Sequence, residues 1–379
     1  MRDPADPADA DSADSAGPAG PAGSVNPPEP ADPAGPGEHA EPAVRPTPPA
    51  RPRPRAGVRR RLAAALILAL AAAGAVYAVN RPARGDAPGH RPFLLAHRGL
   101  AQTYDLAGVT GDTCTATRIH PPRHPYLENT LPAMRAAFAA GADMVELDVQ
   151  VTRDGHLAVF HDHMLECRTD GTGSVRDHTL AALRRLDLGY GYTSDGGRTY
   201  PLRGTGVGLL PTVPEAVAAF GGRELLLHLK GDRPADGTAL ADYLATLPPQ
   251  RLGTLAVYGG DTSVAAFAAR LPGVRVMSKR IAAACLTRYV ATGWTGHVPD
   301  ACRHRHLHLP HRYGRWLWGW PNLFAARMRE AGTRVVLVAG DGEFSAGFDT
   351  PRDVAALPRH FPGAVWTNQV DVVAPLLRR

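Results

Sequence analysis

The sequence predicts an α/β protein with a distorted (β/α)8 barrel, because short apolar runs alternate with Ala-rich helical stretches from residue 93 onward. The chain has 379 residues, enough for one domain of ~250–300 residues and further segments before it. Nine runs resemble strands, one more than the barrel holds, so one should be a loop or an outlying strand. They are FLLA (93–96), MVELDV (144–149), LAVF (157–160), ELLLHL (224–229), TLAVY (254–258), VRVM (274–277), HLHL (306–309), RVVLVA (334–339) and AVW (364–366).

Helical candidates lie between these runs. In TLPAMRAAFAAGAD, Thr130 can cap the helix, Pro132 fits its first turn and Gly141 can end it. Similar stretches are VPEAVAAF (213–220), ADGTALADYLATL (235–247), TSVAAFAARL (262–271) and NLFAARMREAG (322–332). Only QVTRDGH separates MVELDV from LAVF, which is too short for the crossover that joins parallel strands. We therefore expect the barrel to be distorted there.

Residues 1–61 are dominated by Pro, Ala, Asp and Arg and have almost no large apolar side chains. Such a segment buries too little surface to offset its ordering entropy, so we expect a disordered tail. Its first 44 residues hold nine acids, whereas residues 45–61 hold seven arginines. This charge division is typical of a tail. Because the remaining chain has no zinc-finger spacing or basic helix, we expect no nucleic-acid partner.

Residues 62–79 are an uncharged apolar stretch of 18 residues, just long enough as a helix to cross a ~30 Å hydrocarbon core. The arginines before it favour a cytoplasmic N-terminus. We therefore predict a single-pass cell-membrane anchor with a cytoplasmic tail (1–61), a linker (80–92) and an extracytoplasmic barrel domain (93–379). The alternatives are a leader cleaved after VYA (76–78), which could serve as a small-residue cleavage site, or a soluble helix.

The four cysteines fit an extracytoplasmic, oxidising compartment. Four cysteines allow three pairings. We predict the pairs Cys114–Cys167 and Cys285–Cys302, because each pair falls within one neighbourhood of the proposed barrel. The alternative is four free thiols.

Polar side chains follow or end four of the predicted strands, at the edge of the barrel that carries active sites. They are His97 and Arg98, Glu146 and Asp148, His161 and Asp162, and His228 and Lys230. Residues i and i+2 of a strand share a face, so Glu146 and Asp148 repel unless a cation or a proton lies between them. Carboxylate oxygens are the ligands of hard divalent ions such as Ca²⁺ or Mg²⁺.

Two histidines beside such an ion indicate general acid–base chemistry. Arg98 and Lys230 supply positive charge for an anion, most simply a phosphate. The pattern as a whole therefore favours metal-assisted cleavage of a phosphodiester.

Several segments, in this order, resemble the glycerophosphodiester phosphodiesterase family, which has a TIM barrel related to the phosphatidylinositol-specific phospholipases C. They are AHRG (96–99), ENT (128–130), ELDVQVTRDG (146–155), VFHD (159–162), LLPTVPEAV (209–217), LHLKG (227–231) and VWTNQVDVV (365–373). Each segment is weak alone, but the ordered set is specific and spans about residues 93–373.

The resemblance implies hydrolysis of glycerophosphodiesters to glycerol 3-phosphate and an alcohol, with a divalent ion, Ca²⁺ or Mg²⁺. In the related phospholipases, a neighbouring hydroxyl attacks first and gives a cyclic phosphate. The implied roles are catalysis by His97 and His161, metal binding by Glu146, Asp148 and His228, substrate binding by Arg98, Lys230, Glu128 and Asn129, and support by Asp162.

The chain departs from the family pattern at two places. The family usually has a glutamate where this chain has His228, and imidazole is a softer ligand that suits Ca²⁺ or Mg²⁺ less well. The metal could differ, or Asp232 or water could replace His228 as the ligand. The segment 100–127 is longer than expected and carries Cys114, so it could form a lid clamped to Cys167 and set substrate choice.

Some of these residues have structural alternatives. Glu128 and Asn129 could belong to a helix cap, and His228 could be an interior histidine with satisfied hydrogen bonds. His304, His306 and His308 alternate onto one strand face, which suggests either a second metal site or histidines at the barrel rim.

Three functions are compatible with the sequence. The leading one is a membrane-anchored hydrolase that acts on small-molecule phosphodiesters. A second is phospholipase C- or D-like cleavage of lipid headgroups, because the anchor would hold the site near a bilayer. A third is a phosphodiester-binding module without catalysis, because His228 replaces an acid.

Overall fold

The structure is a computed structural model that describes residues 56–81, 91–110, 113–340 and 346–377. Most of the predicted tail (1–61) and of the predicted linker (80–92) therefore lies outside the described residues.

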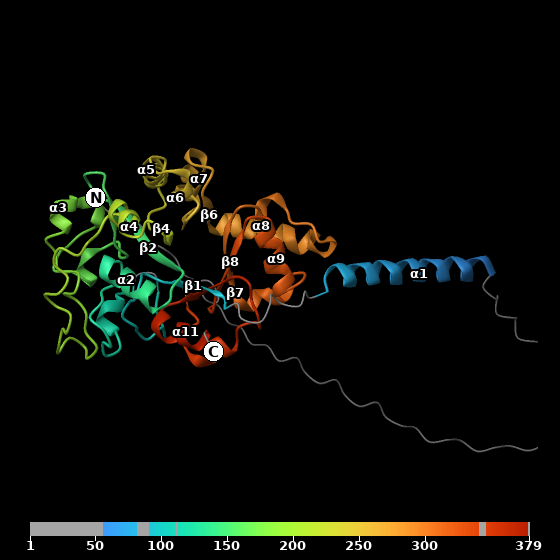
Figure 1. The fold of residues 1–379 in the computed structure, drawn as a ribbon, viewed down its shortest axis with the longest axis horizontal. Helices are drawn as coiled ribbons and strands as arrows, with labels where there is room; N and C mark the ends of the chain where they lie inside the picture. The colour runs from blue at the N-terminus through green and yellow to red at the C-terminus, as the bar shows by residue number, and fades with distance from the viewer. Residues whose placement is uncertain (1–55, 82–90, 111–112, 341–345, 378–379) are drawn as a thin grey trace, which may run out of the picture. The chain divides into compact units, whose positions relative to one another are not determined.

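Eight parallel strands of the described chain form a nearly closed barrel, in the order β6-β5-β4-β2-β1-β9-β8-β7 (Figure 1). The ends of this order, β6 and β7, meet at a parallel bridge between Val276 and Arg305. The predicted (β/α)8 barrel is thereby confirmed. Its strands are β1 (Phe93–Ala96), β2 (Met144–Val151), β4 (Glu224–Leu229), β5 (Leu255–Gly259), β6 (Arg275–Met277), β7 (His306–Pro310), β8 (Arg334–Val338) and β9 (Ala364–Thr367).

The outlying strand is β3 (Leu157–Val159), which pairs antiparallel with the end of β2. Antiparallel neighbours need only a tight turn, so the short QVTRDGH connection requires no crossover helix. The expected distortion is therefore an additional hairpin on β2, and not a barrel strand that lost its helix.

Helices surround the strands in Figure 1. They are α2 (Leu131–Ala140), α3 (Leu180–Leu183), α4 (Val213–Ala219), α5 (Pro234–Leu244), α6 (Pro249–Leu252), α7 (Asp261–Arg270), α8 (Lys279–Thr292), α9 (Asn322–Glu330), α10 (Pro351–Ala355) and α11 (Val370–Leu377). The 3-10 turns are η1 (Thr115–Arg118), η2 (Leu165–Cys167), η3 (Val175–Asp177), η4 (Gly293–Thr295), η5 (Asp300–Cys302) and η6 (His311–Trp316). As predicted, Thr130 caps α2 and Gly141 ends it in a left-handed conformation.

The two faces of each barrel strand have different surroundings, because side chains alternate along a strand. In β2, Val145 and Leu147 join the apolar core between the strands and the helices. Met144 belongs to a second core inside the barrel, together with Tyr258 and Trp366. The inner face therefore has an apolar floor below the C-terminal ends of the strands.

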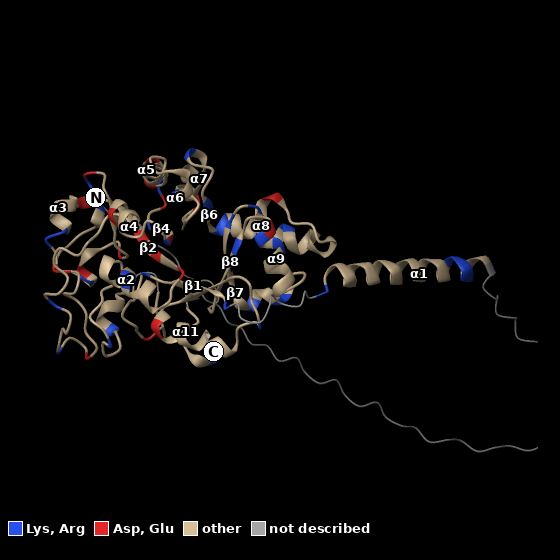
Figure 2. Ribbon diagram, in the orientation of Figure 1, with Lys and Arg blue, Asp and Glu red and all other residues tan. Residues whose placement is uncertain are grey.

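The helix α1 (Ala56–Val79) has 24 residues, so it begins before the predicted stretch at 62–79. Figure 2 shows its arginines gathered near its start and no charged residue along the rest. At ~1.5 Å per residue such a helix is long enough to cross a ~30 Å hydrocarbon core. By length and composition it could be a membrane anchor or a signal sequence.

Both predicted disulfides are present. Cys114 is bonded to Cys167 and Cys285 to Cys302. The first bond joins the segment 100–127 to η2, and the second joins α8 to η5.

Candidate active site

The candidate active site lies at the C-terminal ends of the barrel strands, where the strand register places polar side chains beside each other. Asp148 of β2 pairs with His228 of β4, which in turn pairs with Tyr258 of β5. Glu146 lies two residues before Asp148, and both side chains are fully buried. The pairing of β1 with β2 then places His97 beside Glu146.

The two buried carboxylates have pKa values that shift in opposite directions. Burial, and then the negative charge of Asp148, raises the pKa of Glu146 above its ordinary value. Burial would also raise the pKa of Asp148, but the neighbouring His161, Arg98 and Lys230 lower it well below its ordinary value. Two ionised carboxylates this close repel each other, and a cation between them would neutralise their charge.

Glu146, Asp148 and His228 offer ligand atoms that lie within 4.8 Å of one another, the one group of this kind in the part of the chain that the structure describes. His228 Nδ1 lies 2.8 Å from Asp148 Oδ1, and the imidazole stacks on the Tyr258 ring at 4.1 Å. Two carboxylates and one imidazole are a donor set that fits a divalent ion. The side chain of His228 is therefore close enough to both carboxylates to share an ion with them.

Asp232, the alternative third ligand, has a different task. Its carboxylate accepts hydrogen bonds from the backbone N–H groups of Thr262 and Ser263, at 2.7 and 2.9 Å. These residues form the first turn of α7, so Asp232 satisfies helix N–H groups. It does not join the group formed by the two carboxylates and His228.

Asn368 orients the imidazole of His97. The Asn368 amide donates through Nδ2 to Asp349 at 2.8 Å, so its oxygen faces His97 Nδ1 at 2.6 Å. His97 Nδ1 is therefore the donor, and Nε2 accepts from Arg98 Nε at 3.0 Å. Burial and the charge of Arg98 lower the pKa of His97 well below its ordinary value, so the imidazole is neutral at neutral pH.

His161 is held in the same tautomer from the other side of the site. Its Nδ1 lies 2.6 Å from Asp162 Oδ1, which can only accept when ionised. Burial, and then the charge of Arg98, lowers the pKa of His161 to about 4. Both histidines are thus neutral and carry their lone pair on Nε2, as a general base requires.

Arg98 is buried among acids because the chain turns sharply after β1. Arg98 and Gly99 both have positive φ, and a Cβ on Gly99 would lie 2.9 Å from the carbonyl carbon of Ala133. Glycine is therefore required at this close approach. The turn lets the Arg98 backbone N–H donate to Glu146 at 3.1 Å, while its Nη1 donates to Glu128 at 2.9 Å.

The remaining predicted substrate residues contact Asp148. Lys230 Nζ lies 3.9 Å from Asp148 Oδ1. Asn129 donates to Asp148 Oδ2 at 2.9 Å and accepts from its backbone N–H at 3.0 Å. Thr130 caps α2, whereas Glu128 and Asn129 point into the site. The helix-cap alternative therefore applies to Thr130 alone.

The three alternating histidines of β7 and the residues before it do not form a second metal site. His304 is exposed and its ring faces the carbonyl of Gly273 at 3.2 Å. His306 and His308 face the barrel interior, with their rings 5.3 Å apart. Within the described ranges they join no group of three potential ligands.

A cavity of about 380 Å³ opens beside His97 and Arg98. The segment 100–127 forms one wall of it, and the residues after β9 form another. That segment contributes Ala101, Gln102, Thr103, Tyr104, Leu106 and His120 to the lining. The cavity is large enough to hold a small molecule beside these two side chains.

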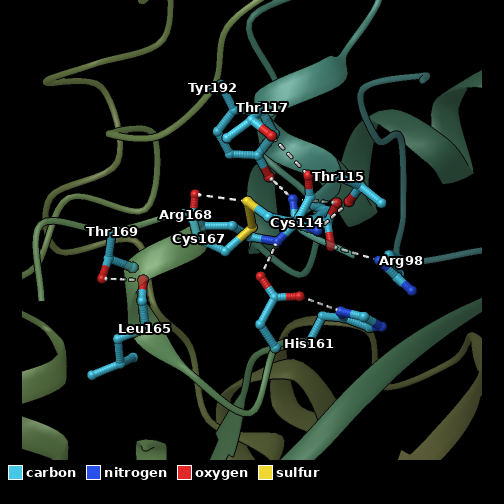
Figure 3. The surroundings of a disulfide bond; sticks show 12 residues. Arg98, Cys114, Thr115, Thr117, His161, Leu165, Cys167, Arg168, Thr169 and Tyr192 are labelled. Carbon is cyan, nitrogen blue, oxygen red and sulfur yellow. Dashed lines mark hydrogen bonds and ion pairs between the residues drawn. A yellow bond between two sulfur atoms is a disulfide. The ribbon is translucent and has the colours of Figure 1, made fainter. Parts of the chain in front are cut away.

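The sequence pattern did not identify three residues of the site: Tyr258, Asn368 and Arg168. Tyr258 donates to Glu146 Oε1 at 2.8 Å, and Asn368 orients His97. Both follow or end a strand, which is the signal that could have indicated them. Arg168, labelled in Figure 3, comes from a loop beside Cys167 and carried no such signal.

Residues 97–236 match the model of the glycerophosphoryl diester phosphodiesterase family. The chain is 37% identical over 105 residues to a glycerophosphodiester phosphodiesterase of Caldanaerobacter subterraneus. The aligned region covers 27% of this chain and 39% of the relative. The chain is also 40% identical over 97 residues to one of Bacillus subtilis, covering 25% and 32%. The chain thus spans well under half the length of these curated relatives.

The fold also resembles solved structures of low sequence identity. One is the glycerophosphoryl diester phosphodiesterase domain of an uncharacterized Mycobacterium tuberculosis protein, with 22% identity, a TM-score of 0.53 and coverage of 76% of this chain and all of that one. Another is an Oleispira antarctica phosphodiesterase in complex with sn-glycerol-3-phosphate, with 20% identity, a TM-score of 0.50 and coverage of 76% and 98%.

Proposed function

We propose that this chain belongs to the glycerophosphoryl diester phosphodiesterase family, whose model matches residues 97–236, and that it hydrolyses glycerophosphodiesters to glycerol 3-phosphate and an alcohol. The observation that carries the proposal is the convergence of His97, Arg98 and the buried acid pair at one end of the barrel. The names of the similar glycerophosphodiester phosphodiesterases suggest the substrate class, and the side chains of the site suggest how the reaction proceeds.

Arg98 and Lys230 bind the phosphate in this proposal. Both lie close to Asp148, with Arg98 Nε at 3.3 Å and Lys230 Nζ at 3.9 Å, so they face the same point from β1 and β4. A guanidinium and an ammonium can together neutralise the charge of a phosphodiester. The cavity beside Arg98 takes the remainder of the substrate.

His97 and His161 transfer the protons. One neutral imidazole accepts the proton of the attacking hydroxyl, from water or from a neighbouring glycerol hydroxyl, as a bond to phosphorus forms. The other, which has taken up a proton beside the negatively charged phosphate, donates it to the leaving alcohol oxygen as its bond to phosphorus breaks. Where the glycerol hydroxyl attacks, water then opens the cyclic phosphate, with the two histidines in exchanged roles, to give glycerol 3-phosphate. Asn368 and Asp162 keep both rings in the tautomer that this exchange requires.

Glu146, Asp148 and His228 would hold a divalent ion, Ca²⁺ or Mg²⁺, which would supply positive charge for the phosphoryl oxygens. The raised pKa of Glu146 supports this assignment, because a buried acid beside another acid favours a bound cation or a proton. Tyr258 fixes the Glu146 carboxylate through its 2.8 Å hydrogen bond.

The test is an assay of the full chain, purified in detergent, on glycerophosphocholine and glycerophosphoglycerol. We expect release of glycerol 3-phosphate, suppression by EDTA and recovery with an added divalent ion. No release from either substrate with any of Ca²⁺, Mg²⁺, Mn²⁺ or Zn²⁺ would contradict the proposal. Substrate binding in calorimetry without turnover would then favour a binding module.

Cleavage of lipid headgroups is the second candidate, favoured by the apolar helix α1. It is separated from the first by offering phospholipid vesicles and water-soluble diesters to the same preparation. Diacylglycerol with a phosphorylated headgroup (C type), or phosphatidic acid with a free headgroup (D type), released from vesicles without turnover of the soluble diesters would identify it.

A further inference from the structure

Arg168, the residue after Cys167, has a fully enclosed guanidinium. Its side chain is 3% exposed, and it lies in none of the positions that the proposed reaction uses. A charge at this depth is costly unless acids and hydrogen-bond acceptors surround it. The partners that surround Arg168 therefore indicate what it does.

Two of these partners are acids that support the site from opposite sides. Arg168 Nε lies 2.7 Å from Asp162 Oδ2, and Nη1 lies 3.2 Å from Glu128 Oε2. Asp162 uses its other oxygen to hold His161 Nδ1 at 2.6 Å, and Glu128 uses its other oxygen to hold Arg98 Nη1 at 2.9 Å. Each carboxylate thus bridges Arg168 to a side chain of the site.

Figure 3 shows Arg168 beside the disulfide, with His161 and Arg98 on one side of it. Both contacts are ion pairs, so the charge of one planar guanidinium attracts the two carboxylates from different sides. His161 and Arg98 are thereby linked, each through its own acid, to the same buried group. Burial alone would raise the pKa of Asp162, but the charge of Arg168 and the bond from His161 lower it, which keeps Asp162 an acceptor.

The Cys114–Cys167 disulfide lies next to the same guanidinium in the chain and in space. Thr115 follows Cys114 and accepts from Arg168 Nη2 at 2.7 Å, while Arg168 itself follows Cys167. Tyr192 accepts from Nη1 at 2.8 Å and closes the last side. The disulfide therefore fastens together the two loops that hold Arg168 and its hydroxyl acceptor.

We propose that Arg168 is a positioning residue that fixes His161 through Asp162. The Cys114–Cys167 disulfide keeps Arg168 in place. Through Glu128, Arg168 fixes Arg98 in the same way. This inference rests on the proposed hydrolase function, since it assigns the arrangement of the residues that perform that reaction.

The first test compares Arg168→Met and Arg168→Lys in the full chain in detergent, with glycerophosphocholine as substrate. We expect Arg168→Met to lower kcat about 10²-fold and to raise KM, and Arg168→Lys to lose less because an ammonium still pairs with one acid. The control is Arg251→Met, which removes a buried arginine that donates to the backbone carbonyls of Arg223 and Val217 and to Thr254, away from the site. That variant should keep the wild-type kcat per folded molecule.

The second test shows whether Arg168 acts through the two acids. We expect Asp162→Asn to lower mainly kcat and Glu128→Gln to raise mainly KM. The double variant Arg168→Met/Asp162→Asn should lose little more than the worse single variant, because groups that act as a unit are not additive. A double loss equal to the product of the single losses contradicts the proposal, as does a folded Arg168→Met variant with wild-type kcat and KM.

The third test concerns the disulfide. Cys114→Ser/Cys167→Ser should lower kcat about tenfold at a temperature where the circular dichroism is unchanged, whereas Cys285→Ser/Cys302→Ser should not. Equal kcat in both double variants would remove the disulfide from the proposal.

Should Arg168→Met fail to fold, Arg168→Lys and the Asp162 and Glu128 variants still decide the matter. A wild-type chain without turnover overturns the proposed function, while an active one with unaffected variants overturns only this inference.

Discussion

At the scale of single residues, the hydrogen-bond partner of each histidine determines which ring nitrogen carries the proton. Asn368 and Asp162 both accept from an Nδ1, so His97 and His161 both carry their lone pair on Nε2. A neutral imidazole with its proton on Nδ1 can accept a further proton on Nε2. The two acceptors come from different parts of the chain, which makes the shared tautomer a property of the fold.

The first prediction concerns these two imidazoles. Replacing His97 or His161 by alanine removes one proton transfer, so each variant should lower kcat by roughly 10²–10⁴-fold. The measurement is release of glycerol 3-phosphate at saturating substrate, with His304→Asn as the control because His304 is an exposed histidine away from the site. Wild-type turnover in either alanine variant would contradict the acid–base roles.

The second prediction concerns the imidazole in the proposed metal set. His228 stands beside Asp148 at 2.8 Å and is a softer donor than a carboxylate. We expect His228→Glu to lower the Mg²⁺ or Ca²⁺ concentration that gives half-maximal activity, because the donor set becomes all oxygen. Metal-titrated turnover measures this. The same concentration dependence in wild type, His228→Glu and His228→Ala would show that residue 228 is not a ligand.

At the scale of helices and strands, the sequence predicts what depends on local pattern. The barrel, the α2 cap at Thr130 and the acids of β2 follow from periodicity and strand ends. What it could not predict depends on contacts between distant segments. Tyr258 reaches Glu146 because of the register of three strands, and Arg168 reaches Glu128 from a loop without regular pattern.

The third prediction concerns the turn between β1 and α2. Gly99 has a φ of +82°, and a Cβ there would lie 2.9 Å from the backbone of Ala133. A left-handed conformation costs a non-glycine residue ~1–2 kcal/mol, and this contact adds to the cost. We expect Gly99→Ala to lower the melting temperature and to reduce kcat by displacing Arg98. Gly196→Ala, which is also left-handed but has open space around it, is the control for strain alone.

The fourth prediction concerns the disulfide between α8 and η5. Cys285 and Cys302 are 17 residues apart, and closing a loop of this length stabilises a fold by about 3 kcal/mol. We expect Cys285→Ser/Cys302→Ser to unfold at a lower denaturant concentration, with kcat per folded molecule unchanged. Chemical denaturation measures the first and active-site titration the second. An unchanged midpoint would show that the bond adds nothing to stability.

At the scale of the whole molecule, α1 could be a membrane anchor or a signal sequence, and we propose an anchor with the barrel on the extracytoplasmic side. The helix α1 has exposed apolar side chains and arginines only near its start. Charged side chains are strongly disfavoured in a bilayer core, and basic residues remain on the cytoplasmic side. The two disulfides independently favour an oxidising compartment for the barrel. Helix and disulfides thus favour the same topology for different physical reasons.

The fifth prediction follows from that topology. The full chain should remain with the membrane fraction after a carbonate wash and enter solution only with detergent, because α1 holds it in the bilayer. In cells stripped of their wall, added protease should digest the barrel and spare a tag placed before residue 56. A soluble barrel whose N-terminus maps close to residue 79 would instead identify a cleaved leader. Protection of both the tag and the barrel would place the site in the cytoplasm, where the disulfides would be expected to be reduced.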